Sequence, residues 1–192
     1  MNPTPITMAG ESTFNTFSYL LNGAYSLAKS AREDPEGSNY RRISAVLFSA
    51  FAIEAHLNHI GEVKLPFWSV VEPKLPWRVK LELIAQQLGV ALDYGRRPFQ
   101  SLSDLFKFRD KLAHGKTETA ESSYEYQRYP GDDFGNLEPE WLKKFWSDDA
   151  VHRIREDTLE IIKLLHAKAG LDEYTLHTIG SGAFAERKED TA

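Results

Sequence analysis

The stretch SNYRRISAVLFSAFAIEAHLNHIG, residues 38–61, is apolar on almost every side when it is drawn as a helix. A surface helix would carry a polar face, so this stretch predicts a central helix enclosed by others. Gly61 suits the end of such a helix. Glu54 and Asn58 are one turn apart, so they lie on the same face of the helix and are its polar residues there, surrounded by apolar ones. A carboxylate in that position needs a partner inside the protein.

Four further stretches with helical spacing flank the central one. Glycines or prolines end them, and no alternating run predicts a strand. The fold class is therefore all-α: an antiparallel helical bundle of about five helices. The expected helices are residues 12–33 with a Ser12 cap, 38–61, 76–88, 98 or 101 to 114 with a capping box from Ser101 to Asp104, and Ser147 to Gly170. Residues 1–170 would form the bundle, 116–136 a long loop within it, and 171–192 a C-terminal arm or flexible tail.

Composition limits the kinds of protein that this chain can be. Its 192 residues are 42% hydrophobic and 27% charged, which is typical of one soluble globular domain. The chain has no cysteine, which excludes disulfides, thiolate nucleophiles and cysteine zinc sites. The sequence shows neither a signal peptide nor about 18 consecutive apolar residues. We therefore expect a cytoplasmic protein without a membrane span.

Charge is distributed unevenly along the chain. The net charge of −5 argues against broad, sequence-independent binding of nucleic acid. Residues 96–116, however, hold six cations against two carboxylates, a local charge of +4. If the chain binds RNA, we expect its cations here to make the contacts: Arg96, Arg97, Lys107, Lys111 and Lys116.

The fourth expected helix contains FKFRDKLAHGK, residues 106–116, and directs a charge toward its packing side. Arg109 lies near the middle of the apolar half of the helix, and Lys80 is placed in the same way in the third helix. Burying an unpaired charge costs several kcal/mol, so these side chains need a carboxylate, a watery crevice or a ligand anion. We expect a polar cluster of Glu54, Asn58 and Lys80, in which Glu54 pairs with Lys80 or Arg109.

Two more polar residues accompany Arg109 near the end of this helix. Asp110 and His114 are four positions apart and share one edge of its apolar face. Arg109 and His114 diverge by roughly 140° around the axis. One helix could therefore present both to a ligand only by flanking it.

The pattern Arg109-Asp110-x-x-x-His114 resembles the R-x4-H signature of the HEPN superfamily of helical domains. The segment SAFAIEAHLNHIG, residues 49–61, resembles the family helix that carries an inward glutamate and asparagine. The likeness covers residues 12–170, with specificity only in these two segments. It implies a four- or five-helix bundle that forms a two-fold dimer and brings both R-x4-H motifs into one cleft.

In active members of that family the cleft is a metal-independent endoribonuclease. The resemblance thus implies catalytic roles for Arg109, His114 and Asp110, with RNA as the substrate and no metal or cofactor. Cleavage by the 2′-OH of RNA needs a group that exchanges protons near neutral pH, which histidine does. It also needs a cation for the phosphorane charge. By similarity, Asp110 would orient the arginine or the histidine.

Family members differ in function, which leaves alternatives open. Some bind RNA, nucleotides or proteins without cutting, so a non-catalytic binding dimer is the second reading, and an unrelated function is the third. The resemblance also implies a role in toxin–antitoxin or defence systems, with an antitoxin or other protein as partner. Toxins neutralised by a nucleotidyltransferase carry a tyrosine two residues after the histidine. This chain has Lys116 there, which does not support that form of regulation.

Other candidate sites in the sequence are weaker. His56 and His59 could hold a metal, but no third ligand accompanies them, so we interpret them as surface histidines. The glycine-rich GSGAF, residues 180–184, has no strand before it and no lysine, so it predicts a tail rather than a phosphate loop. Trp68 and Trp77 could stack on bases, but packing is the simpler interpretation.

Overall fold

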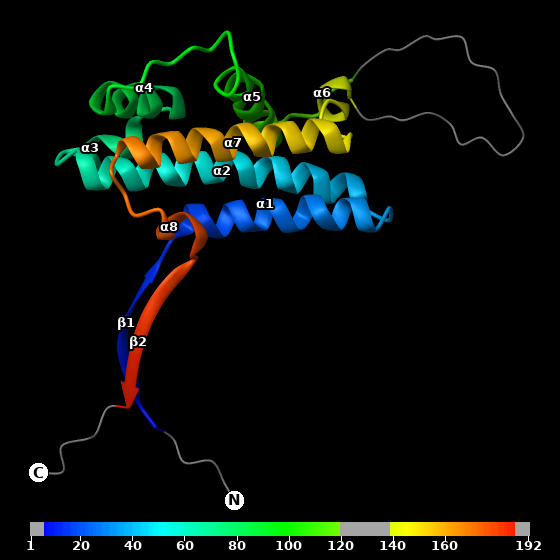
Figure 1. Ribbon diagram of the computed structural model, residues 1–192. Helices are drawn as coiled ribbons and strands as arrows, with labels where there is room; N and C mark the ends of the chain where they lie inside the picture. Colours follow the sequence, from blue (N-terminus) through cyan, green and yellow to red (C-terminus); the bar gives the residue numbers. More distant parts are fainter. Residues whose placement is uncertain (1–5, 120–138, 187–192) are drawn as a thin grey trace, which may run out of the picture. The chain divides into compact units, whose positions relative to one another are not determined.

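The protein is mostly helical in the computed structural model, which describes residues 6–119 and 139–186 (Figure 1). About 67% of it is helix, and one small two-stranded sheet accompanies the helices. The expectation of a mostly helical chain is thus confirmed. The helices are α1 (Thr16–Glu33), α2 (Ser38–Lys64), α3 (Trp68–Val71), the 3-10 helix η1 (Glu72–Lys74), α4 (Trp77–Leu88), α5 (Gln100–His114), α6 (Glu140–Lys143), α7 (Asp148–Lys168) and α8 (Tyr174–His177). The strands are β1 (Met8–Phe14) and β2 (Gly180–Glu186).

The chain divides into two compact units. The first unit comprises residues 1–22, 51–92 and 161–192, and the second comprises residues 23–50 and 93–160. The boundary between the units therefore falls within α1, α2 and α7, so that each of these helices has one part in the first unit and the other part in the second. The R-x4-H segment in α5 belongs to the second unit, and Lys80 in α4 belongs to the first.

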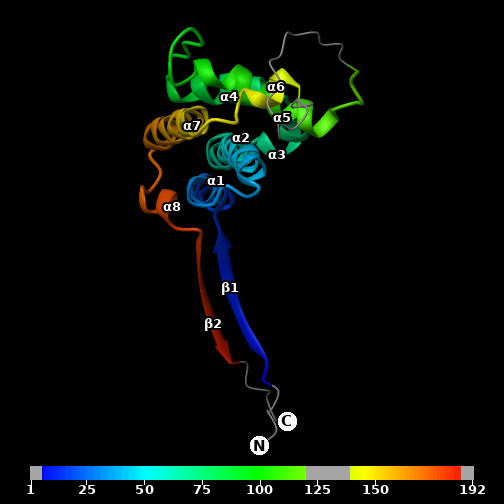
Figure 2. The same ribbon diagram turned by 90° about the vertical axis from the view of Figure 1, so that its right-hand side faces the viewer.

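The two strands belong to the first unit and correct the expectation that the chain has none. β1 and β2 pair in antiparallel fashion, with Met8 opposite Glu186 and Phe14 opposite Gly180. Both views show the strands side by side (Figure 1 and Figure 2). Every residue of β1 is exposed, so the strand has no buried face that could impose an alternating pattern. The predicted tail segment GSGAF lies within β2.

The start of α1 follows from this pairing. The helix begins at Thr16 rather than at residue 12, and the predicted cap Ser12 lies in β1 opposite Gly182. The Asn15 side chain instead donates a hydrogen bond to the carbonyl of Thr178 over 2.9 Å. The Ser18 hydroxyl donates to the carbonyl of Leu176 in α8 over 3.0 Å. Residues of the predicted arm thus hold the N-terminal turn of α1.

Glycine allows close packing and a sharp stop in the first unit. The indole of Trp68 is buried against Gly61 in α2, where an added Cβ would lie 2.1 Å from the ring. Gly89 ends α4 in the left-handed conformation, with φ of 66°, and its backbone N–H bonds to the last carbonyls of the helix. A left-handed residue is the usual end of a helix, which explains why the predicted and observed ends of α4 agree.

In the second unit, aromatic contacts join α5 to α6 and to the segment after it, and an ion pair joins α2 to α7. The rings of Phe108 and Phe145 meet edge to face with centroids 4.6 Å apart. Trp141 of α6 lies beside Phe108 at 6.0 Å. The guanidinium of Arg42 near the start of α2 pairs with Asp148 at the start of α7, with 2.8 Å between Nε and Oδ1. These contacts hold the elements on which the candidate site depends.

Helix α2 is long and apolar enough to cross a membrane by length and composition, and half of its most apolar window is buried inside the protein. A buried core helix passes the same test, so this feature is weak support for a membrane span. The predicted cytoplasmic location stays a prediction.

Candidate functional site

The R-x4-H segment occupies the last two turns of α5. Arg109 is partly buried, with 20% of its side chain exposed, and its guanidinium lies over the ring of Phe106 at 5.2 Å. Its Nε lies 3.0 Å from Oδ1 of the more exposed Asp110. An aromatic face and an adjacent carboxylate both stabilise a guanidinium and restrict its rotamers. Asp110 and Arg109 therefore form an ion pair within the single chain.

His114 is the last residue of α5, and its side chain is exposed. Within residues 6–119 and 139–186, the imidazole ring of His114 makes no hydrogen bond or ion pair. The neighbouring Leu112 and Ala113 are exposed as well, Leu112 by 37%, although both lie on the half of the helix predicted to be apolar. The end of α5 therefore presents an ionisable ring beside apolar surface.

The predicted polar cluster assembles around Lys80 in the first unit. Only 3% of the Lys80 side chain is exposed, and its Nζ lies 3.0 Å from Oδ1 of Asn58 and 3.9 Å from Oε1 of Glu54. The strongest partner is Glu72 of η1, with 2.5 Å between Nζ and Oε1. Glu54 and Lys80 thus form a long ion pair, beyond the hydrogen-bond distance that the sequence predicted, and the sequence analysis missed Glu72.

The five cations proposed for RNA binding are all exposed, but their partners differ. Arg96 lies 3.8 Å from Asp93, and Lys111 forms an ion pair with Glu118. Among the residues that the structure describes, no carboxylate pairs with Lys107 or Lys116. The charges of Lys107 and Lys116 are therefore not compensated by a described carboxylate, which leaves them available to an anionic ligand. The fifth cation, Arg97, forms an ion pair with a buried carboxylate.

Arg97, although about half exposed, pairs with a buried carboxylate that the sequence did not reveal. Its Nε lies 2.7 Å from Oδ1 of Asp157 in α7, whose side chain is only 1% exposed. The hydroxyl of Ser101 donates to the other oxygen of the same carboxylate. The predicted capping box is therefore wrong: α5 begins at Gln100, and Ser101 bonds to Asp157 instead of capping the helix. Asp157 is 56 positions from Ser101, so local spacing could not find the contact.

His56 is fully buried, which contradicts its interpretation as a surface histidine. Its Nε2 lies 3.1 Å from Nδ1 of His166, whose own Nε2 lies 3.0 Å from the carbonyl oxygen of Asp172. Since a carbonyl only accepts, Nε2 of His166 donates to the backbone of Asp172. The two buried histidines also share a hydrogen bond, whose direction depends on their tautomers.

Burial lowers the pKa of His56 from 6.5 to about 3, reinforced by His166 and His59. Burial and His166 also lower the pKa of His59. His56 is therefore neutral at physiological pH. The described part of the chain contains no group of three or more histidine, aspartate or glutamate side chains that could hold a metal ion. His56 belongs to the interior of the first unit, and His59 is half-buried.

Comparisons with known proteins leave the chain without an assigned family. No protein-family model matches it. No curated protein and no solved structure matches it either. Any functional conclusion therefore rests on the residues and their geometry.

Proposed function

We propose that the chain is a HEPN-like, metal-independent endoribonuclease that cleaves RNA through Arg109 and His114. The observation that carries the proposal is the end of α5, where Asp110 and Phe106 fix a partly buried arginine and His114 remains exposed. A fixed cation can stabilise charge that develops in a transition state without reorganising. An exposed histidine can exchange protons with a bound substrate.

In the proposed reaction, the 2′-oxygen of a ribose attacks the adjacent phosphorus, and the bond from phosphorus to the 5′-oxygen breaks. One histidine removes the proton from the 2′-hydroxyl, and a second protonates the departing 5′-oxygen. Arg109 binds the non-bridging oxygens while the phosphorane charge develops. The products are a 2′,3′-cyclic phosphate and a 5′-hydroxyl.

Two protein copies would supply the two histidines. Because Arg109 and His114 diverge by roughly 140° around α5, groups from two chains converge on one phosphate more readily than groups from one. Exposed Leu112 and Ala113 provide apolar surface for such pairing. We infer that the helices form an antiparallel bundle that pairs two-fold with α5 near the axis. Light scattering at tens of micromolar should report a dimer, and a monomer would contradict this arrangement.

The second candidate is a non-catalytic HEPN-like dimer that binds RNA, a nucleotide or a protein. The exposed cations Lys107 and Lys116 favour it, because they offer charge to an anionic ligand away from Arg109. An antitoxin or other protein partner and a role in defence belong to either candidate. Measuring whether the protein cleaves RNA distinguishes the nuclease from the non-catalytic dimer.

The deciding experiment is RNA cleavage in excess EDTA. Wild type should cut single-stranded RNA and leave 2′,3′-cyclic phosphate ends. His114→Ala should stop cutting without changing the circular dichroism spectrum or the dimer, since this side chain is exposed and contributes little packing. The matched control is His177→Ala, which removes another exposed histidine.

Cutting by His177→Ala at the wild-type rate would assign the loss to His114. Equal cutting by wild type and His114→Ala would point to a contaminating nuclease and defeat the assignment. Intact RNA with wild type, combined with binding, would favour the non-catalytic module.

A further inference from the structure

Two adjoining cavities lie between α5 and the segment from α6 into α7, all within the second unit. The first has a volume of about 220 Å³ and the second about 320 Å³. They share Asp104, Lys144 and Phe145 in their walls. Neither cavity includes Arg109 or His114 among its lining residues. Together they fall within the range of about 300–1,000 Å³ that small-molecule sites occupy.

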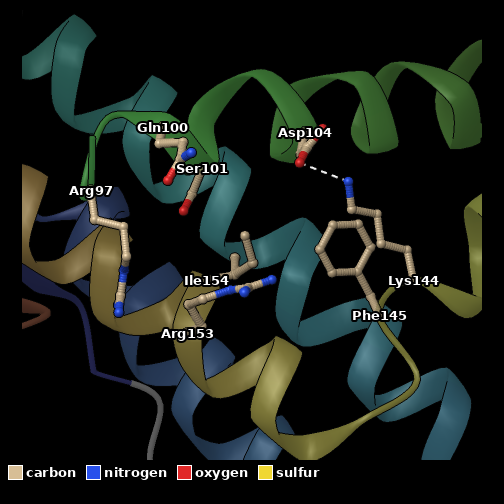
Figure 3. Close-up of a pocket in the computed structure, with 8 residues that line it drawn as sticks. All are labelled: Arg97, Gln100, Ser101, Asp104, Lys144, Phe145, Arg153 and Ile154. Carbon is tan, nitrogen blue, oxygen red and sulfur yellow. Dashed lines mark ion pairs between the residues drawn. The ribbon is translucent and has the colours of Figure 1, made fainter. Parts of the chain in front are cut away.

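The first cavity is lined mainly by cationic and polar groups (Figure 3). Arg97 lies at one end, the Asp104–Lys144 ion pair at the other, and Arg153 between them (Figure 3). Buried Asp157 fixes Arg97 through a contact of 2.7 Å. In the described part of the chain, no carboxylate pairs with Arg153. Three cations around one polar space, with the central one uncompensated, match the charge and donors that a phosphate requires.

Three aromatic and four charged side chains line the second cavity. Trp141 and Phe108 form its walls together with the shared Phe145, and two lysines, Lys107 and Lys111, stand at its edge. Trp141 is half-buried, whereas Phe108 is almost fully buried. The ammonium of Lys111 lies over the Trp141 ring at 5.7 Å, so a base that stacks on this face takes the place of Lys111. A partly exposed indole is a suitable platform for stacking a base.

We propose that the two cavities bind one nucleotide unit, with its phosphate in the first and its base against Trp141 in the second. Of the five cations in the combined lining, Arg97, Lys111 and Lys144 pair with carboxylates. Among the described residues Lys107 and Arg153 have no carboxylate partner, which favours an anion over a neutral ring compound. The site binds a nucleoside phosphate, either free or as part of a single-stranded RNA. The inference goes beyond the proposed cleavage site, because it uses different residues and requires no catalysis.

The test measures binding by the full chain carrying His114→Ala, which prevents cleavage from consuming the RNA. Titration calorimetry measures adenosine monophosphate, and fluorescence anisotropy measures a labelled single-stranded RNA. Arg153→Glu and Trp141→Ala should each weaken binding about tenfold or more, by losing a phosphate contact and a stacking surface respectively. Arg153→Lys and Trp141→Phe should retain most of the affinity, because charge and ring remain.

Matched controls separate this site from general charge and aromatic effects. Lys163→Glu makes the same charge change at an exposed position of α7 outside both cavities, and Tyr40→Ala removes a ring that is 79% exposed. Both should bind like the parent protein. Should Trp141→Ala fail to fold, as circular dichroism would show, Lys107→Glu at the edge of the second cavity should give the same loss.

The two probes distinguish the sources of the nucleotide. Binding of both, with the same dependence on Arg153, supports a site for free and strand nucleotides; binding of RNA alone supports a strand site. No binding of either probe overturns the proposal. So does equal weakening by Lys163→Glu, or phosphotyrosine binding as tightly as adenosine monophosphate. These outcomes are independent of whether wild type cuts RNA.

Discussion

Polar groups in the first unit and polar groups at the end of α5 are held in different ways. Lys80 and His56 are buried, and each has fixed partners nearby. Arg109 lies beside the carboxylate of Asp110 but keeps part of its surface exposed, and His114 is open to solvent. Neutral His56 and paired Lys80 serve the fold, because their charge states cannot change cheaply. A binding or catalytic cleft requires polar groups that are held in place but remain accessible to a ligand, as Arg109 is.

Replacement of Lys80 should give the largest effect that tests this comparison. Lys80→Ala leaves the carboxylates of Glu72 and Glu54 without their shared cation. Loss of one partner in a buried ion pair costs about 3–5 kcal/mol. The two carboxylates are 29% and 27% exposed, so water partly solvates them and we expect the lower end, about 3 kcal/mol. Urea unfolding measures the change in the free energy of unfolding.

The matched control is Lys74→Ala, because Lys74 lies in η1 beside Glu72 but is exposed. Its removal should change the free energy of unfolding by no more than about 0.5 kcal/mol. Equal losses for the two lysines would mean that the cluster stabilises the fold no more than a surface charge does.

Acid should destabilise the protein through His56. The folded pKa of about 3 lies below the unfolded value of 6.5, so between these values the unfolded state binds more protons. The stability from neutral His56 is fully present above pH 6.5 and is lost as the pH falls toward 3. The slope is up to about 1.4 kcal/mol for each pH unit in that window. Urea unfolding at pH 7, 6, 5 and 4 measures it.

His56→Gln isolates this contribution from the carboxylates that also titrate in acid. Glutamine offers His166 a neutral amide with both a donor and an acceptor, but it has no proton to gain in this window. The variant should be less stable than wild type at pH 7, and the difference should shrink as the pH falls. A constant difference across the four pH values would remove His56 as the cause.

Asp110→Asn should have the smallest effect on stability. The Arg109–Asp110 pair joins two groups that keep 20% and 53% of their side chains exposed, and pairs open to water contribute about 0.2–1 kcal/mol. Thermal unfolding should therefore shift only slightly, as it should for Glu82→Gln, which breaks the exposed pair with Arg78. A loss as large as that of Lys80→Ala would erase the distinction between the two regions.

The sequence predicted the long helices because their signals are local. Apolar spacing and end residues lie within the segment that they describe, so the expected 76–88 matches α4 within one residue. The strands were missed because β1 is exposed on both faces and pairs with a segment near the other end of the chain. An alternating apolar pattern arises only where one face of a strand is buried, so a strand without a buried face has no such pattern in its sequence.

The same limit applies to the candidate site. The closeness of Asp110 to Arg109 was expected only from the family resemblance, whereas the inward position of Lys80 follows from its helical face. The partners Glu72 and Asp157 come from other elements, which spacing within one helix cannot supply. His56 was misinterpreted for the same reason, because its partner His166 is 110 positions away.

The β1–β2 ribbon also bears on the order in which the chain folds. Closing a loop between segments so far apart costs conformational entropy before any contact between them forms. A two-stranded ribbon alone is only marginally stable in water, and β1 buries no side chain that could offset this cost. The strands can therefore pair only after the helices have brought Ser18 close to Leu176, 158 positions away. Assembly of the helices thus comes first, and the ribbon closes late and is the part of the fold that opens most readily.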